Sequence, residues 1–435
     1  MIFLYNVLWL LALPGILLYL SLRRLFTGKY RQNLGQRFGL GLEHRENAGS
    51  QEVIWVHALS VGEVLSAIPL IRSLRQEFPD FDIFVSTTTE SGQQVARQKL
   101  DSLNCYFLYF PLDLYWVVHR AVKLIGATLF VLVETDLWPN LLWCLAKQRT
   151  PVVLVNGRLS DRSFPRYRLL RRFFGGVLSN INTFCMQSQE DARRLRQLGI
   201  EGVKIQVTGN LKFDQPLRES ASQERNQLLS ELGWTPPSLT WIAGSTHPGE
   251  EAIILRTYGR LRQRFTDLCL ILAPRNQERF TEVFQLAEQA GWKTVRRSQF
   301  PAGKPAAGAM DVLILDTIGE LARFYSLGNC AFLGGSLVPF GGHNPLEAAQ
   351  RGLPVVFGPH MENFREIAAI LQKSGGGIQV ADENELFERV AAWLATPETC
   401  REQGKKAQEA VIIHQGALAR SLEVIRSTLG EGKVS

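Results

Sequence analysis

The sequence has few cysteines and lacks the spacing that a disulfide or zinc framework requires. Six cysteines are scattered over its 435 residues, none of them in a CxxC pair and most of them in apolar runs. Free thiols in such positions are typical of proteins in a reducing compartment. The chain also lacks a segment of disordered composition, because 46% of its residues are hydrophobic and 20% are charged. We therefore expect a folded protein that is long enough for two domains, each with its own core.

The first 22 residues lack any charged side chain and are dominated by Leu, Ile, Val, Phe and Trp. In a helix, such a run just reaches across a hydrocarbon core of about 30 Å. A secretory signal is disfavoured, because no basic residue precedes the run and no small-residue cleavage site follows it. We expect residues 1–24 to form a membrane-anchor helix, which either spans the bilayer or, because of Asn6 and Pro14, lies in its interface. The basic residues after the run place the globular part on the cytoplasmic side: Arg23, Arg24, Lys29, Arg31 and Arg37.

The surplus of basic residues gives a net charge of +7, which favours anionic partners. Six arginines and a single aspartate lie between Arg158 and Arg172, interleaved with apolar residues such as Leu169 and Phe173. This segment is either a solvated basic helix or a surface for a phosphorylated lipid beside the membrane. Nucleic acid fits less well, because no recognised nucleic-acid-binding module accompanies the charge.

Buried-strand runs alternate with helical patterns in the first half of the chain, which predicts a doubly wound α/β domain. A strand is expected at 53–57, followed by a turn that contains Ser60 and Gly62, a helix, and a second strand at 81–87. Glu63 falls in the first turn of that helix, at the sheet edge where ligands bind. It either stabilises the helix N-terminus or acts as a general base toward an acceptor hydroxyl.

Charged candidates follow further expected strands at the same sheet edge. They are Glu134 and Asp136 after a strand at 127–133, Arg158 after 151–156, and Lys212 after 204–208. Acids at a strand end are more typical of a site than of a core, where they would be desolvated without purpose. Lys212 could face the carboxylate or phosphate of a donor. The DxD pattern Asp80-Phe81-Asp82 precedes a strand and contains an apolar core residue, so we do not expect a metal site there.

A polar segment at 215–238 is expected to be a linker with a connecting helix, after which the strand–turn–helix pattern repeats. The candidates for phosphate or nucleotide contacts again follow expected strands: Ser245 and Thr246 after a strand from Thr240, Pro274 and Arg275 after 268–273, and Ile318, Gly319 and Glu320 after 312–315. N-capping of the next helix is the other explanation for Ser245 or Thr246. Arg275 suits a phosphate or a cytosine, and Glu320 could accept from a hydroxyl.

The most specific stretch runs from Cys330 to Phe364, where a Gly-rich loop and a helix join two short buried strands. Asn344 is placed to cap a helix that begins at Pro345 and continues through Leu346 and Glu347. Such a helix start suits a phosphate group. Glu347 either reaches back to the cap or accepts a hydrogen bond from a ribose hydroxyl.

The string Gly341-Gly342-His343-Asn344-Pro345-Leu346-Glu347 resembles the donor loop of the 3-deoxy-D-manno-octulosonic acid (Kdo) transferases, which are two-domain glycosyltransferases of the GT-B type. Ser60-Val61-Gly62-Glu63 and Glu134-Thr135-Asp136 are similar to further motifs of that family, in matching order. The resemblance extends over nearly the whole chain. Two positions depart from it, since Asp136 stands where the family has Glu and Asn276 where it has His.

The resemblance implies an α/β fold with two doubly wound Rossmann-like domains facing a central cleft and closing over the donor. Residues 25–214 would bind the acceptor, and residues 215–435, with the C-terminal helices, would bind the CMP-sugar. The implied reaction is inverting transfer of Kdo from CMP-Kdo to a lipid A precursor (lipid IVA) in lipopolysaccharide synthesis, at the cytoplasmic face of a bacterial inner membrane. Glu63 would be the general base, with Glu134 as the other catalytic candidate. Arg275, Lys212 and the Asn344 helix start would neutralise the departing CMP, so neither metal nor cofactor is expected.

Two other functions are compatible with parts of the sequence. A membrane-bound GT-B transferase could use a UDP-sugar and another glycolipid acceptor, and it would not be selective for cytidine. A non-catalytic scaffold could bind anionic lipid through residues 158–172, and it would show no turnover. The convergence of acids and bases on strand ends disfavours the scaffold.

Overall fold

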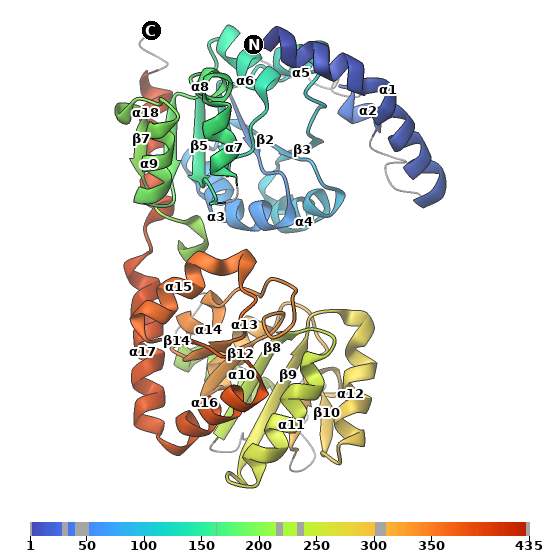
Figure 1. Ribbon diagram of the computed structural model, residues 1–435, viewed down its shortest axis with the longest axis vertical. Coiled ribbons are helices and arrows are strands. Elements are labelled where there is room, and N and C mark those ends of the chain that lie inside the picture. The colour runs from blue at the N-terminus through green and yellow to red at the C-terminus, as the bar shows by residue number, and fades with distance from the viewer. Residues whose placement is uncertain are drawn as a thin grey trace. The chain divides into compact units, whose positions relative to one another are not determined.

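The computed structural model describes residues 2–27, 34–39, 52–161, 163–214, 221–232, 239–300 and 310–431. The chain forms two compact units (Figure 1). Unit 1 comprises Met1–Gln215 together with His414–Ser435, and unit 2 comprises Pro216–Ile413. Several sequence predictions fall outside the described residues: Lys29, Arg31, Arg162, the side chains of Arg23 and Arg24, and the linker ends 215–220 and 233–238.

In the part of the chain that the structure describes, unit 1 contains a seven-stranded parallel sheet in the order β3-β2-β1-β4-β5-β6-β7. Its strands are β1 (Val53–His57), β2 (Asp82–Thr87), β3 (Tyr106–Tyr109), β4 (Leu129–Val133), β5 (Val152–Gly157), β6 (Thr183–Met186) and β7 (Ile205–Val207). Parallel strands read as continuous apolar runs because helices cover both faces. Trp55 accordingly belongs to the core on one face, and Ile54 and Val56 to the core on the other.

The helices of unit 1 include those that connect these strands, the two that precede β1, and the last helix of the chain. They are α1 (Ile2–Thr27), α2 (Leu34–Arg37), α3 (Val61–Glu77), α4 (Glu90–Leu100), α5 (Tyr115–Ile125), α6 (Pro139–Lys147), α7 (Phe164–Leu169), α8 (Arg171–Leu178), α9 (Gln189–Gln197) and α18 (Ala417–Glu431), with the 3-10 turns η2 (Asp101–Leu103), η3 (Gly202–Lys204) and η4 (Leu211–Asp214). The strand order reverses between β1 and β4. Ligands of such sheets bind outside the carboxyl ends of the strands at this point.

Unit 2 repeats the architecture with a second parallel sheet, whose described strands have the order β10-β11-β9-β8-β12-β13-β14. These are β8 (Leu239–Thr246), β9 (Leu268–Pro274), β10 (Thr294–Arg296), β11 (Val312–Ile314), β12 (Cys330–Leu333), β13 (Val355–Phe357) and β14 (Gly377–Gln379). The order reverses between β8 and β12, so the Gly-rich loop after β12 lies at the switch point of this sheet. The two Rossmann-like domains expected from the sequence are therefore confirmed.

The helices of unit 2 include the connecting helix that was expected within the linker. They are α10 (Ala221–Leu232), α11 (Glu250–Arg262), α12 (Phe280–Gln289), α13 (Leu321–Phe324), α14 (Leu346–Gln350), α15 (Arg365–Ser374), α16 (Glu383–Ala395) and α17 (Pro397–Ile413), with the 3-10 turns η5 (Gln277–Arg279), η6 (Arg297–Gln299), η7 (Tyr325–Leu327) and η8 (Glu362–Phe364).

The last helix, α18, differs from the expectation that all C-terminal helices belong to the second domain. It packs with unit 1 because its apolar residues, such as Ile425, complete the core over β1 and α3. The Asp214 carboxylate also accepts hydrogen bonds from the backbone N–H groups of Gly416 and Leu418, each at 2.6 Å. An amphipathic pattern gives the apolar face of a helix but does not say which sheet that face covers.

The N-terminal helix α1 covers the residues for which a helix was expected, and it is part of unit 1. Among the described residues, no helix is both long and apolar enough to cross a membrane.

Candidate functional site

A cluster of carboxylates lies at the switch point of the unit 1 sheet. Glu63 is in the first turn of α3, after β1, and Glu134 and Asp136 follow β4, the neighbouring strand. The side chains of Glu63 and Asp136 are in hydrogen-bonding contact. Glu134 lies close enough to both to raise their pKa values. The structure thus brings together the acids that the sequence placed on two separate strand ends.

Glu63 is held in place by the turn that precedes its helix. Its carboxylate accepts a hydrogen bond from the backbone N–H of Leu59 at 2.6 Å and one from the hydroxyl of Ser60 at 3.0 Å. The Ser60 side chain makes no capping hydrogen bond to the helix backbone. These contacts fix the rotamer of the Glu63 carboxylate, because the residue is only 8% exposed. Gly62 directly precedes Glu63 in the first turn of α3.

Burial and mutual repulsion raise the pKa values of this cluster. Burial raises the pKa of Glu63 to about 8, helped by the charges of Asp136 and then Glu134 and opposed by the two hydrogen bonds. Burial and the Glu134 charge raise the pKa of Asp136 to about 6. Carboxylates in contact cannot all ionise at neutral pH, so the cluster holds a proton there. A carboxyl group with a pKa near the working pH is well matched to general acid–base chemistry.

Glu134 has a left-handed backbone conformation, with φ of +62°, which is unusual for a residue other than glycine. Asn156, at the end of β5, shares this conformation with φ of +57°. The Asn156 side-chain amide lies 3.5 Å from Glu134, and its oxygen accepts from the backbone N–H of Leu211 at 3.0 Å. Strained residues of this kind persist where surrounding contacts fix them and are concentrated at functional sites.

Arg158 and Lys212 lie at the same edge of the sheet as the carboxylates. The backbone N–H of Arg158 donates to the Thr135 hydroxyl at 2.9 Å, which ties the end of β5 to the acidic loop. Lys212 follows Leu211 in η4, next to the Asn156 amide. The backbone at both predicted positions is therefore tied to the loops that carry the acidic cluster, and the contacts of the two side chains with substrate stay a prediction.

In unit 2, the Gly-rich loop is organised around a buried carboxylate that the sequence reading missed. Glu250, at the start of α11, is fully buried. It accepts hydrogen bonds from the backbone N–H groups of His247, Gly335, Ser336 and Leu337, at distances of 2.6 to 3.0 Å. Glu250 thus joins the end of β8 to the loop after β12. Two acids after a Gly in STHPGEE were the available signal, but nothing in them indicates a partner so far along the chain.

Close packing explains the glycine that begins this loop. A Cβ added at Gly334 would lie 2.3 Å from the backbone oxygen of Ser245 and 2.5 Å from the Cα of Thr246. Gly335, Gly341 and their neighbour Gly342 have positive φ values, which favour glycine. The loop therefore lies directly against the β8 end.

A pair of histidines lies between these segments and was also missed as a site. The Nε2 atoms of His247 and His343 are 2.8 Å apart, so one ring donates and the other accepts. The His247 ring stacks on Phe340 with a centroid distance of 4.1 Å. Burial, followed by the charge of Arg275, lowers the pKa of His343 to about 4 and also lowers that of His247. Both rings are therefore neutral at pH 7.

Arg275 provides positive charge at this switch point. It follows Pro274, the last residue of β9, and its side chain is exposed. Its guanidinium lowers the pKa values of both histidines and opposes the rise in the pKa of Glu347 that burial causes. Asn276 lies in the exposed turn that follows. A cation among neutral rings is suited to an anionic ligand.

The interpretation of Ser245 or Thr246 as the N-cap of the helix after β8 was wrong. Ser245 and Thr246 do not cap α11, because they end β8 and the helix is preceded by Gly249. Ser245 instead has a positive φ of +57°, and the buried Thr246 hydroxyl has no hydrogen-bond partner in the described structure. Capping therefore no longer explains either residue, and a role in phosphate binding stays a prediction.

The helix after the Gly-rich loop is shorter than expected and begins one residue later. α14 spans only five residues, Leu346–Gln350, and Pro345 takes the cap position. The Asn344 side chain still accepts from the backbone N–H of Leu346, at 3.1 Å. Glu347 makes no capping hydrogen bond at this helix. The capping-box interpretation of Glu347 was therefore wrong, and its carboxylate lies near the buried Tyr325 and Arg275.

Of the predicted residues after β11, Glu320 is bonded to other side chains, whereas Ile318 and Gly319 are open to solvent. Glu320 accepts from the Arg297 guanidinium at 2.9 Å and from the Thr317 hydroxyl. Ile318 is 69% exposed, and Gly319 has a positive φ of +82° with no atom within 4 Å of an added Cβ. Open space at Gly319 is compatible with close approach of a ligand, but Glu320 would have to exchange a partner to bind one.

No group of three or more His, Cys, Asp and Glu side chains in the described residues is arranged to hold a metal ion.

Comparisons with known proteins agree with the motifs. A family model described as 3-deoxy-D-manno-octulosonic-acid transferase (kdotransferase) matches residues 32–215. The 3-deoxy-D-manno-octulosonic acid transferase of Haemophilus influenzae is 33% identical over 428 residues, covering 98% of this chain and 98% of the relative. The protein of the same name from Chlamydophila psittaci is 31% identical over 413 residues, covering 94% of this chain and 89% of the relative.

Among solved structures, the UDP-GlcNAc 2-epimerase from Neisseria meningitidis bound to UDP-GlcNAc has a TM-score of 0.57. It is 12% identical and covers 88% of this chain and 100% of the epimerase chain. At that identity the likeness shows the fold alone.

Proposed function

The chain belongs to the 3-deoxy-D-manno-octulosonic acid (Kdo) transferase family, and we propose that it transfers Kdo from CMP-Kdo to a hydroxyl of a lipid A precursor, lipid IVA. The observation that carries this proposal is the carboxylate cluster of Glu63, Glu134 and Asp136 at the switch point of unit 1. It combines the motif by which the sequence resembles the family with acids whose pKa values suit proton transfer.

In the proposed reaction, Glu63 removes the proton from the acceptor hydroxyl as the hydroxyl oxygen attacks the anomeric carbon of Kdo. The bond from that carbon to the CMP phosphate breaks, and a single displacement inverts the anomeric configuration. The contacts of Glu63 with Leu59 and Ser60 hold its carboxylate in one orientation during this step. Asp136, in contact with Glu63, keeps a negative charge nearby and makes Glu63 a stronger base.

The donor is assigned to the switch point of unit 2, where Arg275 and the Gly-rich loop lie together. CMP carries one phosphate and Kdo one carboxylate, so the ligand is anionic. Arg275 supports its binding by charge, and the loop glycines allow close approach to backbone N–H groups. Lys212, at the carboxylate edge of unit 1, is assigned to the donor's carboxylate or phosphate. The proposal includes neither a metal ion nor another cofactor.

The proposed location is the cytoplasmic face of the bacterial inner membrane, where a lipid acceptor would be presented. The exposed arginines of α7 and α8 and the apolar N-terminal helix support this location. The family resemblance implies the same location.

The rate of transfer should rise with pH because the proposed base must be ionised. The pKa of Glu63 is raised to about 8 and that of Asp136 to about 6, so kcat/KM should increase from pH 6 through pH 8 and level off only above the pKa of Glu63. The initial rate of CMP formation from pH 6 to above pH 8, measured at acceptor concentrations well below KM, checks the prediction. A rate that is flat between pH 6 and 8 would mean that neither acid limits the reaction.

A donor screen tests the proposed function itself. The full-length protein and lipid IVA are incubated with each of four donors: CMP-Kdo, CMP-sialic acid, UDP-glucose and UDP-GlcNAc. The mass of the lipid product is then determined by mass spectrometry. The proposal predicts a product only with CMP-Kdo. A product formed from a UDP-sugar would establish a different GT-B transferase, and the absence of a product with every donor would favour a scaffold.

A further inference from the structure

Polar contacts fasten the first two turns of α1 to the body of unit 1. The Tyr5 hydroxyl donates to Asp113 at 2.9 Å, and the side-chain amides of Asn6 and Asn140 exchange two hydrogen bonds of 2.9 Å. The Tyr5 ring also lies against Phe173 of α8, with centroids 6.1 Å apart. Figure 1 shows α1 in the region of unit 1 that carries α5 and α6.

The partners of α1 are themselves buried and fixed by backbone. Asp113 and Asn140 are 0% exposed. Asp113 accepts from the backbone N–H groups of Asn140 and Leu141 at the start of α6, at 3.1 and 2.9 Å. Without α1, the side chain of Asn140 would lose its partner in Asn6, and a buried polar group without a partner is costly. Asp113 and Asn140 therefore form a specific docking site that holds the start of α1 in one position on unit 1.

This docking is difficult to reconcile with a helix that crosses the bilayer. Tyr5 and Asn6 form hydrogen bonds with Asp113 and Asn140, which belong to the globular body of unit 1. A globular unit can touch lipid only with its outer surface and does not cross the bilayer. The start of α1 therefore lies on the same side of the membrane as unit 1. A spanning α1 would place its first residues on the opposite side from the basic residues that follow it.

The opposite face of α1 is apolar and exposed. Leu4, Leu8 and Leu11 recur at helical spacing, and Leu11 is 74% exposed. Tyr115 and Trp116 are also exposed beside Asp113, at the start of α5. Tyr and Trp are the residues that prefer the membrane–water interface.

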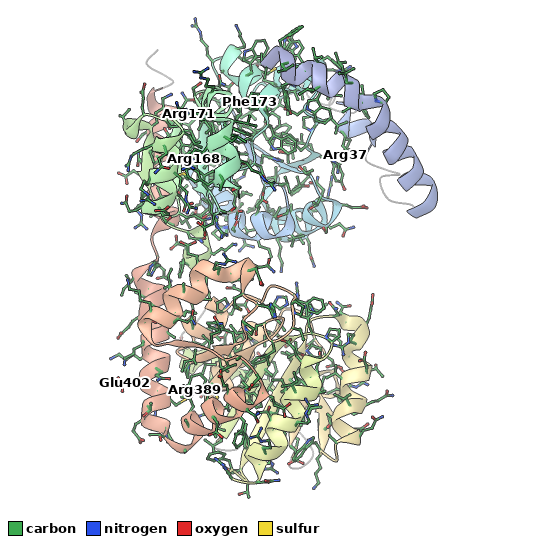
Figure 2. All side chains as sticks on the ribbon, viewed as in Figure 1. Arg37, Arg168, Arg171, Phe173, Arg389 and Glu402 are labelled. Atoms are coloured by element: carbon green, nitrogen blue, oxygen red, sulfur yellow. The ribbon has the colours of Figure 1, made fainter. Side chains whose placement is uncertain are left out.

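Basic residues of α7 and α8 lie near the docked start of α1. Arg168, Arg171 and Arg172 are exposed, and Figure 2 shows Arg168 and Arg171 near Phe173. Arg172 lines a recess of about 220 Å³ between α1, α6 and α8, together with Ile2, Trp143 and Phe173. Apolar side chains next to exposed cations are complementary to lipid with anionic head groups.

We propose that α1 is an interfacial helix, docked on unit 1 by Tyr5 and Asn6 and lying flat in an anionic bilayer surface with its Leu4–Leu8–Leu11 face in lipid. The proposal rests on the membrane location given under the proposed function and deepens it. It places both ends of α1 on the cytoplasmic side.

Protease protection of the full-length protein tests this placement. An epitope tag with a protease cleavage site is added before Met1, and a second tag with its own cleavage site is added after Ser435. Protease is then added to spheroplasts and to inside-out vesicles, and cleavage at each site is measured. We expect both sites to be cut only in the inside-out vesicles. Cleavage of the N-terminal site in spheroplasts would show a spanning helix and overturn the proposal while leaving the membrane location intact.

Vesicle binding of purified variants tests the face itself. Leu11→Glu should weaken sedimentation with phosphatidylglycerol-containing vesicles at least fivefold, whereas Ile413→Glu, a 77% exposed position of unit 2, should not. Arg171→Gln should weaken it about fivefold, and the exposed Arg389→Gln in α16 should not. Equal effects within either pair would overturn the proposed surface. Failure of the wild-type protein to bind any vesicle would overturn the membrane location, while the donor screen would still decide the reaction.

Discussion

Replacing Glu63 by Gln is expected to lower the rate of Kdo transfer by roughly 100- to 10,000-fold, the range in which a general base contributes. Gln has the shape of Glu and can still accept a hydrogen bond from the backbone N–H of Leu59, so the turn should be retained. It cannot take a proton from the acceptor hydroxyl. Steady-state CMP formation with wild type and variant checks the expectation, and donor affinity should change little.

We expect the Glu63→Gln protein to fold, because at high pH the ionised Glu63 carboxylate destabilises the folded state, whereas a neutral Gln side chain does not. Its pKa is raised from 4.5 to about 8 in the folded state, so the unfolded state ionises more easily. The stabilisation that this group provides is fully present below pH 4.5 and is lost as the pH rises through 8. The variant has no such loss, and its midpoint of thermal unfolding should not fall below that of wild type at pH 9.

The matched control for this substitution is Glu90→Gln. Glu90 also lies in the first turn of a helix in unit 1, but it is exposed. If Glu63 only stabilised a helix N-terminus, the two variants would have similar, near wild-type activity. Full activity in Glu63→Gln would move the base to Glu134, whose side chain belongs to the same cluster.

Replacing Glu250 by Ala is expected to destabilise unit 2 severely. The carboxylate accepts four backbone hydrogen bonds from β8 and the Gly-rich loop while fully buried. Leaving buried donors unsatisfied costs about 1–3 kcal/mol each. A total loss of about 4 kcal/mol would lower the midpoint of thermal unfolding by roughly 10 °C. Differential scanning calorimetry of the full chain, with CMP binding as a second measurement, checks this.

Glu282→Ala is the control for the Glu250 substitution. Glu282 forms an exposed ion pair with Arg279 within one turn of chain, and such pairs contribute little. Its removal should shift the unfolding midpoint by only about 1 °C. If Glu250→Ala unfolded at the wild-type temperature and still bound CMP, the loop would not depend on this carboxylate.

The strand pattern could be predicted from the sequence because parallel strands buried on both faces are continuous apolar runs. The runs at 53–57 and 127–133 correspond to β1 and β4, the strands that position the acids. Strands β3, β6, β10 and β14 were not predicted, because runs of three or four residues carry no more signal than a short buried helix segment. The position of α18 also required the structure, since its partners lie about 200 residues earlier in the sequence.

The candidate site was predictable where motif residues follow strands and was missed where partners come from distant loops. Glu63 and Glu134 follow neighbouring strands, and the strand order brings them together. The contact of His247 with His343, by contrast, joins the ends of β8 and of the loop after β12, and neither residue has a distinctive local pattern. The cap positions at Thr246 and Asn344 were misjudged because helix ends are the least certain part of a propensity argument.

The central claim is that the acids of unit 1 drive an acceptor-dependent transfer from a cytidine-activated sugar. Its most direct test is CMP release from freshly prepared CMP-Kdo, with and without lipid IVA, for wild type and Glu63→Gln at pH 8 in detergent. We predict release by wild type only when lipid IVA is present, and at least a 100-fold slower release by the folded variant. Equal release by both proteins would contradict the assignment of the base to Glu63, and release that does not depend on the lipid would contradict the acceptor-dependent transfer itself.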